Sequence, residues 1–127
     1  MKNKSRKYSL HPRLRILCGT VIAFGPGKAD LLEALQKTGS ITEASARLGM
    51  SYMRAWTLIR TMNRCFKEPL VIAVRGGTRG GGGASLSETG RQVLELYRRM
   101  ENKCIETTRG DWGKIQQFLK KESGPKK

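Results

Sequence analysis

The stretch SITEASARLGMSYMRAWTLIRTMNR, residues 40–64, carries the strongest fold signal in this chain of 127 residues. Ser40 and Glu43 have the spacing of a capping box, in which a hydroxyl and a carboxylate satisfy the free N–H groups at a helix start. Gly49 can adopt the left-handed conformation that ends a helix, and Ser51 can cap the next one. The stretch therefore predicts two short helices joined by a tight turn.

The two predicted helices each have one apolar face. The residues expected to point inward recur at helical spacing, and they are Ile41, Ala44 and Leu48 in the first helix and Ala55, Leu58, Ile59, Met62 and Phe66 in the second. The opposite face of the second helix holds Met53, Thr57, Arg60, Thr61 and Arg64. A helix, a glycine turn and a second helix with a cationic outer face form the helix-turn-helix pattern, whose second helix lies in the major groove of DNA. An ordinary helical hairpin shares this pattern, so other features must separate the two.

The charge of the chain favours a polyanionic partner. Lys and Arg number 25 against 10 Asp and Glu, which gives a formal net charge of +15. Such an excess indicates nucleic acid first and a membrane surface second. The aromatic content is only 6%, which disfavours a single-strand binder that stacks bases.

Enzyme, metal and cofactor functions find no support in the sequence. The three cysteines, Cys18, Cys65 and Cys104, are far apart and form no C-x-x-C pair, so a zinc site or a disulfide framework is not expected. Each is expected to be a small buried side chain in a reduced cytoplasm. The only histidine, His11, lies in a basic arm, and no carboxylate pair or activated nucleophile is readable. Residues 1–24 resemble a signal peptide only loosely, because no clean cleavage site follows. We expect a cytoplasmic chain that is not an enzyme and has no metal, cofactor or tightly bound small molecule.

The first part of the chain predicts an arm, a hairpin and a helix. Residues 1–13 carry five basic side chains and no acid, which is typical of a flexible arm that is either solvated or in contact with phosphates. Residues 14–24 predict two short strands. Pro26 suits the first turn of a helix, and Gly39 ends it, which completes a three-helix core. The hairpin residues available for burial are Ile16, Cys18, Val21 and Ala23.

A predicted wing follows the second helix of the stretch. Residues 70–74 form a β-branched run, and residues 75–85 are rich in Gly and Arg. Two short strands around such a tip predict a wing, whose glycines allow close approach to phosphate. The run is not a P-loop, because no Gly-Lys-Ser/Thr follows, although it could also be an RGG-like RNA-binding segment.

The last part of the chain predicts a long helix that Ser87 caps. Its apolar residues fall close to a 3.5-residue repeat, and they are Val93, Leu94, Tyr97, Met100 and Cys104. This row could pack on its own domain or on a second copy. Gly110 and Gly113 weaken helix formation, but Ile115, Phe118 and Leu119 indicate a short further helix.

These motifs together resemble the N-terminal DNA-binding domain of ModE-type, molybdate-responsive transcriptional regulators. The resemblance spans about residues 12–104 and rests on FGPGKADLLEAL (24–35), TGSI (38–41), LGMSYMRAW (48–56), Met62-Asn63, the glycines and Arg75 of 75–84, and LSxxG (86–90). It implies a mainly helical winged helix-turn-helix fold with small β-sheets, related to LysR-type regulators, and a homodimer with a long C-terminal dimerisation helix.

The resemblance and the cationic helix face together give the expected DNA-binding residues: Ser51, Tyr52, Met53, Arg54, Thr57, Arg60 and Arg64 on the second helix, and Arg75, Thr78, Arg79, Gly80 and Gly81 in the wing. We expect Arg54 to read base edges and the wing to position the protein. Trp56 matches the family's tryptophan, and we expect it to pack at the margin of the apolar face.

The expected organisation is a basic arm over 1–13, a winged helix-turn-helix domain over 14–104, and a helical extension with a basic tail over 105–127. Full-length ModE proteins continue into molybdate-binding domains, for which the residues after Cys104 are too few, so molybdate sensing is not expected here. The expected function is a sequence-specific regulator of the ModE type that binds double-stranded DNA. The alternative is an RNA-binding or nucleoid-type protein that binds nucleic acid without sequence preference.

Overall fold

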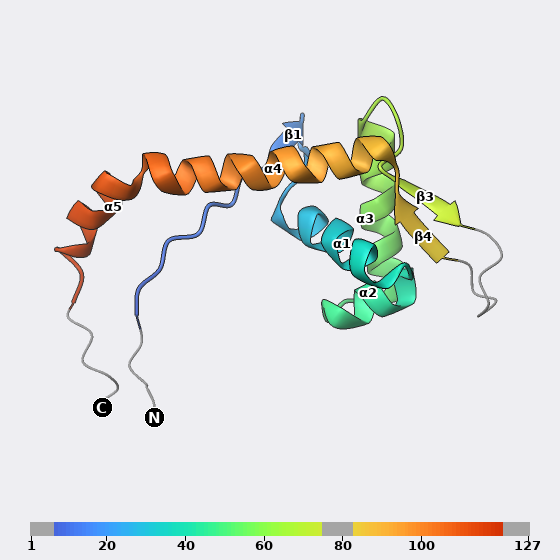
Figure 1. Ribbon diagram of the computed structural model, residues 1–127, viewed down its shortest axis with the longest axis horizontal. Helices are drawn as coiled ribbons and strands as arrows, with labels where there is room; N and C mark the ends of the chain where they lie inside the picture. The colour runs from blue at the N-terminus through green and yellow to red at the C-terminus, as the bar shows by residue number, and fades with distance from the viewer. Residues whose placement is uncertain (1–6, 75–82, 121–127) are drawn as a thin grey trace. The chain divides into compact units, whose positions relative to one another are not determined.

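The computed structural model describes residues 7–74 and 83–120 (Figure 1). The chain divides into two compact units, of which one is Arg13–Arg99 and the other joins the residues before and after it. The elements in chain order are β1 (Ile16–Cys18), β2 (Val21–Phe24), α1 (Pro26–Thr38), α2 (Ile41–Arg47), α3 (Tyr52–Cys65), β3 (Val71–Val74), β4 (Gly83–Leu86), α4 (Glu88–Thr107) and α5 (Arg109–Gln116). The predicted fold class is confirmed, since helices dominate and the sheets are two small antiparallel hairpins.

Local capping chemistry sets the ends of α1, α2 and α3. Gly39 follows α1 with φ 69°, and its N–H donates to the Leu35 carbonyl at 2.8 Å. Ser51 Oγ accepts a hydrogen bond from the Arg54 N–H at 3.0 Å and so begins α3. Ser40 Oγ accepts one from the Glu43 N–H at 3.1 Å. The capping box is only half formed, because the Ser40 N–H donates to Thr38 Oγ1 at 3.3 Å instead of to a carboxylate.

The core of the Arg13–Arg99 unit lies among α1, α2, α3 and the start of α4. The predicted inward faces of α2 and α3 are buried, and Leu48 and Phe66 pack at the margin. Phe24 makes edge-to-face contacts with Phe66 and Tyr97, with ring centroids 6.1 Å and 5.1 Å apart. The Tyr97 hydroxyl donates to the Leu14 carbonyl at 2.7 Å, so α4 is held to the start of the first hairpin.

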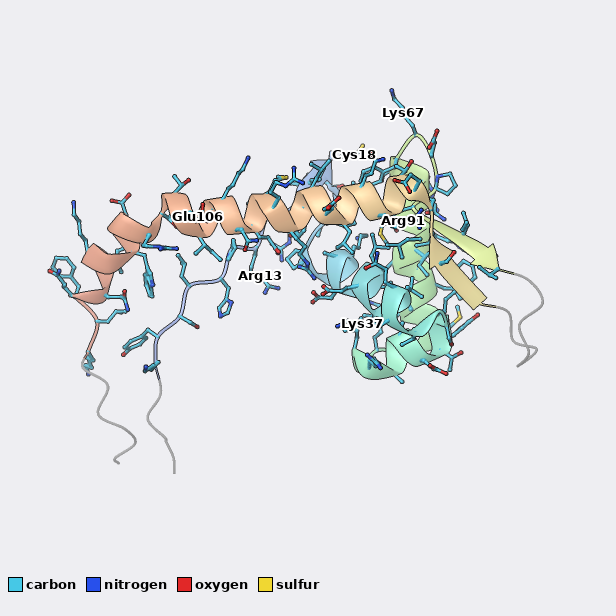
Figure 2. The ribbon with its side chains drawn as sticks, viewed as in Figure 1. Arg13, Cys18, Lys37, Lys67, Arg91 and Glu106 are labelled. Carbon is cyan, nitrogen blue, oxygen red and sulfur yellow. The ribbon has the colours of Figure 1, made fainter. Side chains whose placement is uncertain are left out.

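The hairpin β1–β2 is antiparallel, as predicted, but its burial differs from the prediction. Ala23 is buried, whereas Ile16, Cys18 and Val21 are exposed. The reason is that β2 is the strand in contact with α1 and α3, and only its last two residues reach the core. The predicted burial of the cysteines is wrong as well. Cys18, which Figure 2 labels, and Cys65 are exposed, and Cys104 is partly exposed.

The second hairpin is hydrogen-bonded directly to the helical part of the fold. β3 and β4 pair from Val71↔Leu86 to Val74↔Gly83. The Ala84 N–H donates to the Gly39 carbonyl at 3.1 Å, which ties β4 to the turn between α1 and α2. The base of the predicted wing is therefore held against the helix-turn-helix.

Ser87 caps α4, as predicted. Its Oγ accepts from the Gly90 N–H at 2.9 Å and donates to the Pro69 carbonyl at 2.6 Å. Arg98 of α4 forms ion pairs with Asp30 and Glu33 of α1, at 2.9 Å and 2.5 Å. The first half of α4 is thus fixed on the helical core.

The short further helix α5 contains both Gly110 and Gly113 and ends at Gln116, before the predicted Phe118 and Leu119. An added Cβ would meet nothing at either glycine, so these glycines weaken the helix without being needed for close packing. No helix in the described ranges combines the length and apolar character that crossing a bilayer requires.

Candidate nucleic-acid interface

The outer face of α3, which we define as Met53, Thr57, Arg60 and Arg64, is exposed along its length. Met53, for example, is 69% exposed. The Thr57 hydroxyl donates to the Met53 carbonyl at 3.0 Å, so its proton is used within the helix and its oxygen can still accept. This face presents two guanidinium groups, a thioether and a hydroxyl, which are groups that can contact phosphates and base edges in a major groove.

One side of α3, the wing-side flank, consists of Tyr52, Trp56 and Asn63 and lies against the β3–β4 hairpin. Asn63 Oδ1 accepts from the Leu70 N–H at 2.8 Å and the Val71 N–H at 3.2 Å, and its Nδ2 donates to the Val71 carbonyl at 3.1 Å. A cleft of about 400 Å³ separates the rest of this flank from the hairpin. Asn63 therefore fixes where β3 begins relative to α3.

Trp56 packs less completely than predicted for a residue at the margin of the apolar face. It is 37% exposed, and its Nε1 donates to the Tyr52 hydroxyl at 2.7 Å. Both rings line the cleft beside the hairpin and also a shallow hollow over Met53, Thr57 and Arg60. The tryptophan thus joins the wing-side flank to the outer face of α3.

The other side of α3, the α1-side flank, consists of Arg54, Thr61 and Cys65, which helical spacing places on one side. Lys28 of α1 lies beside it. Its residue is only 8% exposed. Burial lowers the pKa of the Lys28 ammonium, the positive charge of Arg54 lowers it further, and Cys65 acts in the opposite direction. The structure therefore adds a cation that the sequence reasoning missed, because a lysine at a helix start is usually solvated.

The predicted helix residues fall into three groups in the structure. Ser51 caps α3 through its Oγ. Met53, Thr57, Arg60 and Arg64 share the outer face, while Tyr52 and Arg54 lie on opposite flanks. All of them are exposed. The predicted wing residues Arg75, Thr78, Arg79, Gly80 and Gly81 lie outside the described residues, whereas the strands on either side of them are described.

Within residues 7–74 and 83–120, no three His, Cys, Asp or Glu side chains come together as a set that could hold a metal ion.

A protein-family match covers the helix-turn-helix and the second hairpin. The bacterial regulatory helix-turn-helix proteins of the lysR family match residues 28–91, which is just over half of the chain. The chain belongs to this family. The matched range runs from Lys28 in α1 to Arg91 in α4 and so includes α2, α3 and the second hairpin.

Curated relatives extend the match to one group of LysR-related proteins. The molybdenum transport protein ModE of Azotobacter vinelandii is 46% identical over 79 residues, which are 62% of this chain and 29% of that protein. The transcriptional regulator ModE of Yersinia pestis is 37% identical over 89 residues, 68% of this chain and 34% of that protein. The molybdenum-pterin-binding protein MopB of Rhodobacter capsulatus is 36% identical over 86 residues, covering 68% and 32%. The chain spans about a third of the length of these relatives, and the resemblance read from the motifs is confirmed over that part.

Proposed function

We propose that this lysR-family chain is a DNA-binding transcriptional regulator of the ModE type that binds duplex DNA as a homodimer. The observation that carries the proposal is the outer face of α3, where Arg60 and Arg64 are exposed beside Met53 and Thr57. Ser51 caps α3 through the Arg54 N–H, so Arg54 lies in the first turn of the helix. The printed names of several relatives, which call them transcriptional regulators, support the same class.

The proposed division of labour follows the position of each side chain. Arg54, in the first turn of α3, reads a base edge, since a guanidinium can pair bidentately with guanine O6 and N7. Arg60 and Arg64 lie further along the helix and contact phosphates or base edges. The wing residues Arg75, Thr78, Arg79, Gly80 and Gly81 position the protein on the backbone, a role that rests on the sequence alone.

The proposal of a homodimer rests on exposed apolar side chains of α4. Leu96 is 51% exposed, Met100 45% and Ile105 37%. Large apolar side chains repeated along a helix are the kind of surface that a second copy covers. Sedimentation at micromolar concentration should show twice the 14.2 kDa chain mass, and a monomer would contradict the proposal. As a regulator of this type, the protein acts in the cytoplasm and is not an enzyme.

Selection of bound fragments from a genomic duplex pool tests the proposal directly. A sequence-specific regulator should enrich a few fragments that share a motif. Unrelated duplex and RNA of equal length should then compete at least a thousandfold more weakly than the enriched site. Equal competition by RNA or by random duplex would instead support the non-specific nucleic-acid binder and contradict sequence-specific regulation.

A further inference from the structure

Lys28 is a buried cation in a place where three effects oppose its charge. Its residue is 8% exposed, so the side chain has lost much of its hydration. It is the third residue of α1, where the positive end of the helix dipole disfavours a cation. The positive charge of Arg54, on the neighbouring helix α3, disfavours it further. A positive charge at this position costs the free protein stability.

The described part of the chain offers Lys28 no compensating carboxylate. The ion pairs there include Arg91–Glu88, Arg98–Asp30 and Arg98–Glu33. None of them includes Lys28 or Arg54, and neither side chain has a hydrogen-bond acceptor among residues 7–74 and 83–120. The two cations are thus close enough to interact at one flank of α3, and no carboxylate among the described residues is paired with either of them.

A single bound anion would offset the three effects that disfavour the positive charge of Lys28. It would pair with the ammonium, screen Lys28 from Arg54, and meet the positive end of α1, whose N-cap Gly25 has no side chain to accept a hydrogen bond. Lys28 lies beside the α1-side flank, which adjoins the outer face of α3. An anion bound there would therefore lie at the edge of the proposed DNA contact. Backbone phosphates border a helix that lies in the major groove.

We propose that Lys28 is a phosphate-binding residue, which holds one phosphodiester of the DNA backbone beside Arg54 at the flank of α3. This inference rests on the proposed function, since it names the backbone group that Lys28 meets when α3 enters the groove. Lys28 then contributes affinity without sequence preference, while Arg54 beside it reads a base.

The test uses the whole chain and Lys28→Met, which keeps the length of the stem and removes the charge. Binding to the selected site and to a random duplex is measured over a series of salt concentrations. The slope of log K against log salt should become shallower by about 1.8, because each protomer of the proposed homodimer loses one phosphate contact worth about 0.9. At 0.1 M salt this corresponds to about sixtyfold weaker binding on both duplexes. The Tm of the free variant should rise by roughly 2–5 °C, because a buried, unmatched cation is gone.

Two further variants control the result. Lys28→Arg keeps the charge and should keep the wild-type slope. Lys67→Met removes one exposed charge from the loop beyond the far end of α3, where Figure 2 labels the side chain, and it should also keep that slope. A change of equal size in Lys67→Met would trace the effect to net charge and overturn the inference.

The remaining outcomes also decide the question. An unchanged slope in Lys28→Met, with wild-type binding intact, would overturn the phosphate contact and leave the proposed function standing. If Lys28→Met weakened binding to the selected site but not to the random duplex, Lys28 would only orient Arg54. If it lowered the Tm of the free protein, Lys28 would have a packing role. Either result contradicts the inference. A wild-type chain that binds no duplex would overturn both proposals.

Discussion

The two flanks of α3 differ in how their polar groups are used. On the wing-side flank, Asn63 makes three hydrogen bonds to the backbone around Leu70 and Val71, and Trp56 donates to Tyr52. On the α1-side flank, Lys28 and Arg54 have neither an acceptor nor a carboxylate in the described part of the chain. The polar side chains of the wing-side flank find partners within the protein, whereas no described residue supplies a counter-charge to the two cations at the α1-side flank.

The difference separates support from binding on a single helix. Hydrogen bonds that the protein satisfies hold a helix in place, whereas charges that it leaves unmatched are available to a ligand. The same α3 can therefore be held firmly against the β3–β4 hairpin and still present cations to DNA. Variants on the wing-side flank should change stability more than binding, and variants on the α1-side flank should do the reverse.

The largest effect is expected where the hairpin meets α4. Gly90 is the third residue of α4, and a Cβ there would lie 2.2 Å from the Leu70 carbonyl oxygen. Gly90→Ala should cost about 3 kcal/mol or more of unfolding free energy in urea titrations, since neither backbone can give way cheaply. Where no such contact exists, replacing a helix-interior glycine with alanine raises the free energy of unfolding by up to about 1 kcal/mol.

Gly110→Ala is the matched control, because a Cβ at this α5 glycine meets no atom within 4 Å. It should be neutral or stabilising. If Gly90→Ala behaved like Gly110→Ala, the close approach of α4 to Leu70 would not be a fixed support of the wing-side flank.

Asn63→Ala should show the next largest loss of stability. The substitution removes three hydrogen bonds and leaves the Leu70 and Val71 N–H groups to find other partners. We expect a loss of about 2–4 kcal/mol, with little change in the salt slope of binding. Gln92→Ala removes an exposed amide that donates to Glu88 at 3.2 Å, and it should cost less than about 0.5 kcal/mol. Equal losses in the two variants would remove Asn63 as the anchor of the hairpin.

Arg54→Ala tests the α1-side flank through binding. It should cost about 1–3 kcal/mol on the selected site and little on random duplex, because the lost contact is to a base. The prediction for Arg79→Ala comes from the sequence alone. That variant should weaken both duplexes similarly and reduce the salt slope by about one unit for each protomer. Circular dichroism should be unchanged in both. If Arg54→Ala weakened both duplexes alike, Arg54 would be a backbone contact instead of a base contact.

Much of α3 could be predicted from local chemistry. Its inward face follows from helical spacing, and its start follows from Ser51, because a hydroxyl three residues before a free N–H is a short-range interaction that needs no tertiary information. The cap of α4 by Ser87 was predictable for the same reason. The start of the helix that carries Arg54, for which we propose a base contact, could therefore be predicted from the sequence.

The flanks of α3 were not predictable, since they depend on which elements pack across them. Asn63 is an ordinary polar residue in sequence, and its role appears only once β3 lies beside it. Lys28 looks like a solvated lysine, although its third place in a helix without a first-turn acid was a signal. The burial of the first hairpin was predicted wrongly for a related reason. Alternation marks Ile16 and Val21 as apolar, but it does not say which strand faces the core.

The smallest effect is expected from Tyr52→Phe, which removes only the hydroxyl that accepts from Trp56 Nε1 at 2.7 Å. Tyr52 is 45% exposed and Trp56 37%, so water can replace the lost acceptor, and the unfolding free energy should fall by about 0.5 kcal/mol or less.

Trp112→Phe leaves Trp56 as the only tryptophan of the chain, so its emission reports on this pair alone. In that background, Tyr52→Phe should change the emission of the free protein, and duplex should still shift it, because the indole borders the outer face of α3. A loss above about 1 kcal/mol would place the pair in the core. The wing-side flank would then hold α3 through its rings as well as through Asn63, and the contrast with the α1-side flank would be larger than the hydrogen bonds alone imply.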